Sequence, residues 1–377
     1  MRLGDDLVTA AAPADYRPVL RQGVLLSEPL LHGPRTVHLV RHPGSGQSFE
    51  IGVREHFLLA RMDGRRTLGD LGAAYAEAYG RRLGDANWRQ LLALLGTKGL
   101  LADAPEPAGE AAPPPDAARP ANRLLRGSLP LVADAAATAA RLHRAVRPLL
   151  TARCVLPLLV LIAAMELTLA LHLGALLDGA ATVLGHPVLL AAVFALLWLS
   201  TALHELAHGV VAHHHGGTVS AIGLRWRLPM VIMYCTVDNY RYLATRWRRI
   251  QIAAAGAVMN ALVLLPFFLW WLLAPAGGTR DALAGLLFLG SLHAFTMLIP
   301  LPPLDGYTIV SQAAGAAALA TSSRTHLAAT LRRDRTALAG YPRRARRVYA
   351  AYTALAATTV AALLATLAAL VHTLLTR

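Results

Sequence analysis

The sequence predicts an α-helical polytopic membrane protein with about five transmembrane helices and a small N-terminal α+β domain. Hydrophobic residues make up 55% of the 377-residue chain and charged residues only 15%, and the mean hydropathy is +0.45. Soluble domains contain roughly 25% charged residues, so this balance indicates a lipid environment. Long apolar stretches fill the second part of the chain, whereas the first part alternates short strand-like and helix-like patterns.

Residues 1–103 have the pattern of a small cytosolic domain. A His42-Pro-Gly-Ser-Gly turn separates two β-type segments. A Thr67-x-x-Asp70 capping box then begins a helix that ends at Gly80. Two strands followed by three short helices are typical of a winged-helix-like module. The predicted elements are strands over residues 36–40 and 48–53 and helices over residues 55–62, 67–79 and 85–98.

Residues 104–122 contain six prolines among alanine, glutamate and glycine, which predicts a solvated linker because there is nothing to bury. Residues 123–148 form a predicted juxtamembrane segment, and residues 131–148 of it are amphipathic with regularly spaced arginines. This pattern fits a helix lying along the membrane surface, and a plain solvated helix is the alternative.

Residues 149–377 form the predicted membrane domain. A spanning helix needs about 20 apolar residues, and five stretches of this length are present. Arginines gather before the first stretch, between the second and third, and between the fourth and fifth, while the other two loops are almost uncharged. The positive-inside rule therefore places the N-terminal domain in the cytosol of a cell membrane, and it explains the net charge of +14 without nucleic acid as a partner. The five stretches are residues 149–177, 187–212, 250–274, 283–301 and 348–375.

A candidate metal-binding motif, His204-Glu205-Leu-Ala-His208, ends the second apolar stretch. Two histidines four residues apart share one helix face and can both reach one zinc ion. Glu205 lies beside them and can take a proton from water. Ionisable groups in hydrocarbon cost about 2.5 kcal/mol or more each, so three within five residues require a compensating partner. A chance pair of hydrogen-bonded histidines is the alternative.

Asp305 is the candidate third ligand, because a catalytic zinc site has three protein ligands and an open position. It lies in Pro300-Leu-Pro-Pro-Leu-Asp305-Gly306, after the fourth apolar stretch. Counting spans from a cytosolic N-terminus brings Asp305 and the paired histidines to the same membrane face. The prolines end the helix and free the aspartate to turn inward. A simple helix-terminating loop residue is the alternative.

Other polar residues have weaker patterns. Asn260 lies within the third stretch, where its amide could hydrogen-bond substrate or an oxyanion or join two helices. The run of three histidines at residues 213–215 follows a helix end, where polar side chains reach the interface. His293 is an intramembrane histidine that could approach the site.

The ordered set formed by the His204-Glu205-x-x-His208 motif, Gly256-x-x-x-Asn260 and Leu304-Asp305-Gly306 resembles the site-2 protease family of intramembrane metalloproteases. The resemblance covers about residues 150–375. It implies that His204, His208 and Asp305 bind Zn²⁺, that Glu205 is the catalytic glutamate, and that Asn260 is the motif asparagine.

Two further stretches narrow the resemblance. Residues 234–238 and 305–307 look like the peptide zinc metalloproteases found beside modified-peptide genes, and residues 57–101 look like a PqqD-like peptide-recognition module. Such modules bind leader peptides by adding a strand to their sheet. The sequence departs from the family at Ala257, where proline is usual, and near Met297, where an asparagine often stands.

The resemblance implies an intramembrane zinc endopeptidase that cuts a precursor peptide or membrane-inserted substrate near the cytosolic face of the bilayer. Removing the leader of a ribosomally made, modified peptide is the favoured outcome. Two alternatives remain at this point: a protease that cuts an anti-sigma factor or a signal-peptide remnant, and a non-catalytic zinc-binding scaffold for peptide export or immunity. Glu205 disfavours the scaffold, because a structural site needs no base.

Overall fold

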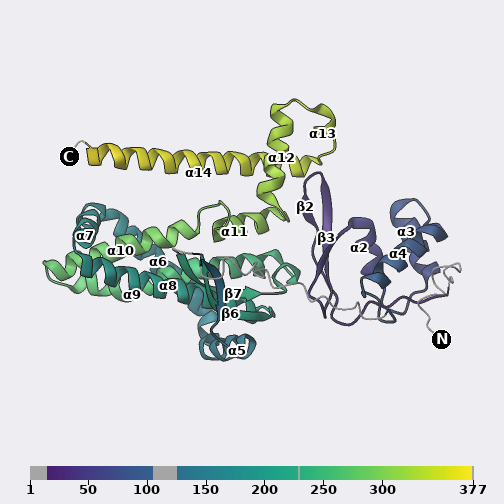
Figure 1. Ribbon diagram of the computed structural model, residues 1–377, viewed down its shortest axis with the longest axis horizontal. Coiled ribbons are helices and arrows are strands. Elements are labelled where there is room, and N and C mark those ends of the chain that lie inside the picture. The colour runs from purple at the N-terminus through teal and green to yellow at the C-terminus, as the bar shows by residue number, and fades with distance from the viewer. Residues whose placement is uncertain (1–14, 105–124, 228–229, 376–377) are drawn as a thin grey trace. The chain divides into compact units, whose positions relative to one another are not determined.

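The computed structural model describes residues 15–104, 125–227 and 230–375. The chain divides into two compact units, residues 1–117 and 118–377, and each is described by itself (Figure 1). The boundary falls inside the predicted linker, residues 104–122, which lies almost wholly outside the described residues. The described part is mostly helical, as predicted.

The first unit contains a small antiparallel sheet centred on β3 (Arg35–Arg41). Strand β4 (Ser48–Gly52) pairs with one edge of β3, and β1 (Leu25–Leu26) and β2 (Leu30–His32) pair in succession with the other. Pro29 separates β1 from β2, because proline has no amide hydrogen for the ladder. The predicted strands correspond to β3 and β4, whereas the short β1 and β2 were not predicted.

Three helices follow the sheet, as predicted: α2 (Val53–Leu59), α3 (Leu68–Tyr79) and α4 (Asp85–Thr97). The Thr67–Asp70 capping box is present, and Gly80 ends α3 in the left-handed conformation. A shared core of buried side chains holds these helices on the sheet. It includes Val40, Leu59, Leu71 and Trp88. The α+β composition is confirmed, and its assignment to the winged-helix class stays a prediction.

Two stacked imidazoles join the sheet to α2. The rings of His38 and His56 lie 3.6 Å apart between centroids and nearly parallel, and His38 hydrogen-bonds the Ser27 carbonyl. Burial, together with the neighbouring His38 and Arg61, lowers the pKa of His56 to about 4. This environment holds His56 neutral near pH 7.

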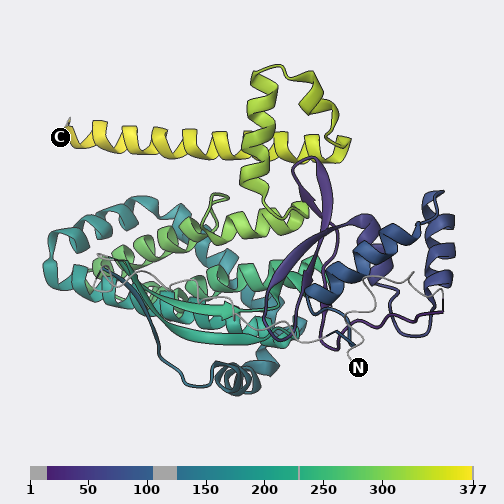
Figure 2. The same cartoon turned by 45° about the vertical axis from the view of Figure 1, so that its right-hand side comes forward.

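In the second unit, four helices are long and apolar enough to cross a membrane: α6 (Ala152–Leu171), α8 (Pro187–His214), α9 (Arg246–Leu273) and α14 (Arg343–Leu375). Helices α8, α9 and α10 (Gly278–Met297) run alongside one another (Figure 1; Figure 2). Helix α14 packs on α12 (Leu319–Leu331), and α13 (Arg335–Ala339) lies between them in sequence.

Two predicted spans differ in part from the helices of the structure. The stretch at residues 283–301 corresponds to α10, which begins earlier, includes Arg280 and Asp281, and is not among the four helices long and apolar enough to cross a membrane. Helix α10 packs on α7 (Leu173–Gly185) and α9, so much of its surface faces protein, and this fifth span stays a prediction. The stretch at residues 149–177 is divided between α6 and α7, because the chain leaves the helical conformation at His172.

A second sheet lies in this unit. Strands β6 (Val219–Arg227) and β7 (Met230–Val237) cover two β-type runs of the sequence, residues 219–224 and 231–237, and β5 (Arg126–Pro130) pairs with the other edge of β6. The amphipathic segment forms α5 (Ala135–Val146). Its apolar face, Ala135 and Ala139, packs on Val219 and Ile222 of β6. The predicted helix within residues 131–148 is therefore present as α5, and part of its apolar face packs on the sheet. Its placement along a membrane surface stays a prediction.

Candidate metal centre

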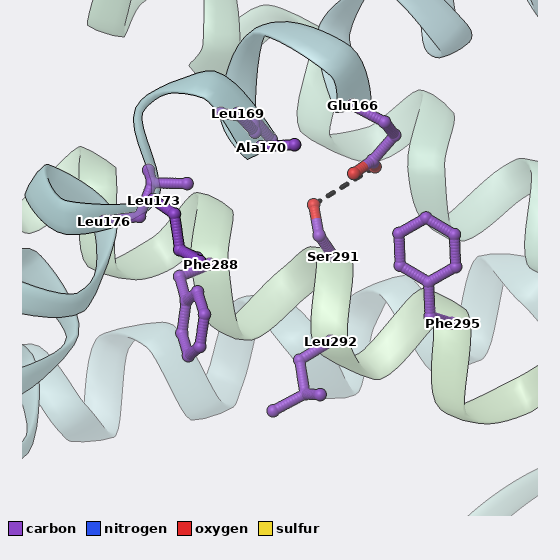
Figure 3. Close-up of a pocket in the computed structure, with 9 residues that line it drawn as sticks. All are labelled: Glu166, Leu169, Ala170, Leu173, Leu176, Phe288, Ser291, Leu292 and Phe295. Atoms are coloured by element: carbon purple, nitrogen blue, oxygen red, sulfur yellow. Dashed lines mark hydrogen bonds between the residues drawn. The ribbon is translucent and has the colours of Figure 1, made fainter. Parts of the chain in front are cut away.

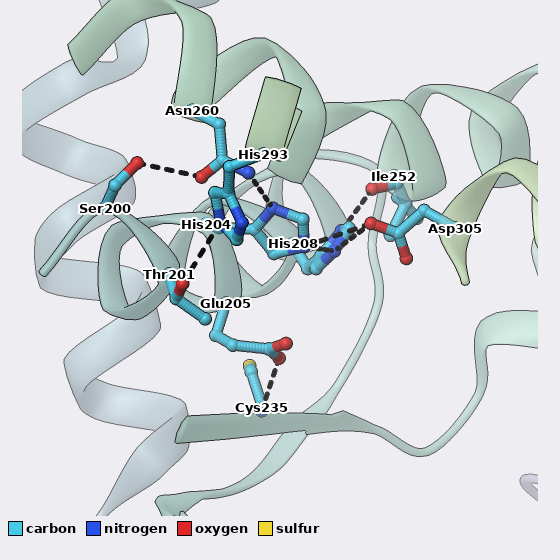
Figure 4. Close-up of polar contacts among 10 residues, drawn as sticks. All are labelled: Ser200, Thr201, His204, Glu205, His208, Cys235, Ile252, Asn260, His293 and Asp305. Atoms are coloured by element: carbon cyan, nitrogen blue, oxygen red, sulfur yellow. Dashed lines mark hydrogen bonds and ion pairs between the residues drawn. The ribbon is translucent and has the colours of Figure 1, made fainter. Parts of the chain in front are cut away.

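His204 and His208 lie on one face of α8, and Asp305 is the first residue of α11 (Asp305–Ala314). The polypeptide between Met297 and Asp305 is irregular because of its three prolines, and α11 packs on α9. The fold thereby brings Asp305 beside the two imidazoles, as the sequence predicted (Figure 4).

The three side chains have the spacing of metal ligands. His204 Nε2 lies 3.1 Å from His208 Nε2 and 3.0 Å from Asp305 Oδ2, and His208 Nε2 lies 3.4 Å from that oxygen. Ligands of a tetrahedral zinc ion, at bond lengths near 2.05 Å, are separated by about 3.3 Å. Asp305 Oδ2 is buried, and no hydrogen bond among the described residues satisfies it. A cation between the three atoms would do so, and the group could therefore hold a metal ion.

A backbone carbonyl orients His208. Its Nδ1 lies 2.6 Å from the oxygen of Ile252 in α9. Since a carbonyl only accepts, Nδ1 carries the proton, which leaves the Nε2 lone pair free for a metal. This contact could not be predicted from residue types, because every residue has a backbone oxygen.

Asn260 orients His204. Its amide Nδ2 lies 3.1 Å from His204 Nδ1, and its Oδ1 accepts a hydrogen bond from the Ser200 hydroxyl at 2.9 Å. A metal on Nε2 of His204 would leave the ring proton on Nδ1. If the Asn260 amide is turned by half a rotation, its Oδ1 accepts a hydrogen bond from this Nδ1, and its Nδ2 donates one to the Ser200 hydroxyl oxygen. Asn260 is only 1% exposed. These contacts join α9 to α8, one of the roles that the sequence suggested, and they orient His204. A contact of the amide with substrate or an oxyanion stays a prediction.

Gly256 lies one turn before Asn260 on α9 and faces His204. A Cβ at Gly256 would lie 2.5 Å from His204 Cε1 and 2.6 Å from Cδ2. Real Cβ atoms essentially never approach other atoms this closely. The imidazole therefore occupies the space that any larger residue would fill. This close approach explains why glycine stands at the first position of Gly256-x-x-x-Asn260.

Glu205 is held beside the group by strand β7. Its Oε2 accepts a hydrogen bond from the Cys235 amide at 3.1 Å, and a Cβ at Gly209 would lie 2.7 Å from Cys235 Sγ, so helix and strand are in close contact. Burial, together with the charge of Glu205, raises the pKa of the Cys235 thiol to about 12. Cys235 is therefore a neutral packing group rather than a thiolate ligand or nucleophile.

The remaining candidate histidines lie outside the three-ligand group. His293 Nε2 contacts the Thr201 hydroxyl at 3.3 Å, and the group that could hold a metal does not include it. The histidines at residues 213–215 begin five residues after His208, at the end of α8.

Sequence reasoning missed Glu166, a carboxyl within α6. It accepts a hydrogen bond from the Ser291 hydroxyl of α10 at 3.1 Å (Figure 3). The two side chains border a pocket of about 290 Å³ whose other lining residues, such as Leu169, Phe288 and Phe295, are apolar. An acid inside an apolar stretch is itself a signal of a functional site, so the sequence contained this information.

The full chain was also compared with known proteins. No protein-family model, curated protein or solved structure matches it. The resemblance to site-2 proteases therefore depends on the motif set and stays a prediction.

Proposed function

We propose that this protein is an intramembrane zinc endopeptidase. One observation carries the proposal: two imidazoles and one carboxylate from separate helical segments converge within 3.0–3.4 Å, with Glu205 adjacent in the motif. Three protein ligands leave the open position that distinguishes a catalytic zinc site from a structural one. The ligand-bearing part of α8 belongs to a helix long and apolar enough to cross a membrane.

A zinc ion held by these ligands supplies Lewis-acid chemistry, acidifying water and polarising the scissile carbonyl. Glu205 accepts the proton of the attacking water and later gives it to the amide nitrogen that leaves. The Cys235 amide holds the carboxylate in position through its hydrogen bond. Asn260 and the Ile252 carbonyl keep the two imidazoles oriented.

Strand β7 offers an edge on which a substrate could unwind and bind. The Cys235 amide bonds Glu205, and the Val231 carbonyl accepts a hydrogen bond from the Trp198 indole at 3.3 Å. Alternate residues of an antiparallel strand point their backbone groups to the same side. The amide and carbonyl of Met233, between these two, therefore face away from β6. A peptide added along this edge would lie beside Glu205.

The favoured substrate is the precursor of a ribosomally made, modified peptide, whose leader would be removed near the cytosolic face. The arginine distribution and the family resemblance support this choice. In the first unit, β4 pairs only with β3 among the described strands, so a leader peptide could be added as a further strand beside it. We infer that this unit recruits the substrate and that the membrane unit cleaves it.

The experiment is co-expression of the full chain with a candidate precursor peptide, chosen from small reading frames next to its gene, followed by mass spectrometry of the peptide. Wild type should release a leader, and Glu205→Gln should not, although it retains its metal. Asp178→Asn is a matched control, because it removes an exposed carboxyl from α7 and should leave processing unchanged. Unchanged processing by Glu205→Gln would reject the enzyme and favour a metal-binding scaffold.

A further inference from the structure

A second group of histidines gathers at the end of α8. His143, on α5, lies beside His213 and His214, the last two residues of α8, although about seventy positions separate them in sequence. His143 Nε2 is 3.1 Å from His214 Nδ1. The ring centroid of His143 lies 5.1 Å from that of His213 and 5.3 Å from that of His214.

This geometry closely matches that of the paired histidines in the first group. The nitrogens of His204 and His208 are also 3.1 Å apart, and their ring centroids are separated by 4.7 Å. The His143–His214 pair is thus already spaced for one metal ion. The His213 ring meets His143 edge-on. As the side chains stand, the three histidines do not form a group with the spacing of metal ligands, so the third bond requires a rotation of the His213 side chain at the helix end.

The two groups are separate. His214 lies six residues beyond His208, which corresponds to about 9 Å along the helix axis and roughly 240° around it. The second group offers imidazole nitrogens only. Such donors suit zinc and its transition-metal neighbours, whereas calcium and magnesium prefer oxygen.

We propose that His143, His213 and His214 form a second transition-metal site, which binds Zn²⁺ and fastens α5 to the end of α8. Because α5 also packs on β6, a metal here fixes the sheet that carries β7 relative to α8. This proposal does not depend on peptidase activity.

The test is zinc content per chain, measured by mass spectrometry of the metal in full-length, detergent-purified protein that has been stripped with a chelator, reloaded with Zn²⁺ and desalted. Wild type should bind two equivalents. His143→Gln and His214→Asn should each bind one. His214 is exposed at a helix end, so its replacement tests the site without removing a buried side chain.

His32→Gln is the matched control, because it removes an exposed histidine that pairs with Glu50 in the first unit, and it should keep two equivalents. Asp305→Asn should lose the first site and keep the second. If wild type binds one ion and His143→Gln and His214→Asn keep it, the second site does not exist. Two ions retained in both variants would place the second ion elsewhere and equally overturn the proposal. If wild type binds one ion and only the His143 and His214 variants lose it, the ion belongs to the second group, and the proposed active site binds none.

Discussion

Replacing Gly256 by alanine tests the close approach of α9 to His204. The new Cβ would lie 2.5 Å from His204 Cε1, whereas ordinary van der Waals contact begins at 3.4 Å. The ring must therefore shift by about 0.9 Å, the difference between these distances. Metal–ligand distances vary by only about 0.2 Å in an intact site, so His204 would leave the coordination sphere. We expect a loss of zinc affinity greater than the roughly 10–100-fold caused by removing a supporting hydrogen bond.

The affinity is measured by competition with a chromophoric chelator in a His214→Asn background, which leaves only the first site to titrate. Gly174→Ala is the control, because a Cβ at Gly174 in α7 meets nothing within 4 Å. Thermal melting verifies that both variants remain folded. Wild-type zinc affinity in Gly256→Ala would refute the claim that this glycine makes room for a metal ligand.

Three further outcomes follow from the contacts described above. Asn260→Leu should lower zinc affinity by about 10–100-fold, whereas Asn260→Asp, which still accepts a hydrogen bond from His204, should keep the wild-type affinity. Equal losses in a chelator competition would contradict the orienting role of Asn260. Because His56 has a pKa near 4 when folded and near 6.5 otherwise, the unfolded state binds more protons between these values, so the first unit should lose stability as the pH falls from 6.5 to 4. Hydrogen-exchange protection of residues 35–59, corrected for intrinsic exchange rates, should show this loss, and a His56→Leu protein with the same pH dependence would argue against it. Arg249, which is 2% exposed, donates a hydrogen bond to Gln312 of α11 at 2.8 Å. Arg249→Met should therefore lower the free energy of unfolding by about 1.5–3 kcal/mol and reduce Tm, whereas replacing the exposed neighbour, Arg248→Met, should not. Equal melting temperatures of the two variants would show that the bond contributes little.

The metal group was predictable because its signal is local. The spacing of His204 and His208 identifies one helix face, and the aspartate after the proline-rich segment supplies the third donor. Arginine counts brought Asp305 to the same face independently of the motif. The structure places the three side chains together, and their position at the cytosolic face of a membrane stays a prediction.

Other features depend on tertiary contacts that a single sequence does not display. The amphipathic pattern of α5 is the same whether its apolar face meets lipid or β6, and only the structure shows Ala139 packed on the sheet. The role of Asn260 depends on which helix faces it. The break at His172 lies inside one continuous apolar stretch, so hydropathy alone joined two helices into one span.

Crystals of the zinc-loaded protein, measured at the zinc absorption edge, test the central claim most directly. The account predicts an anomalous peak about 2.0–2.2 Å from His204 Nε2, His208 Nε2 and Asp305 Oδ2. A loaded crystal with no peak among these three atoms would contradict it, whatever is found at His143.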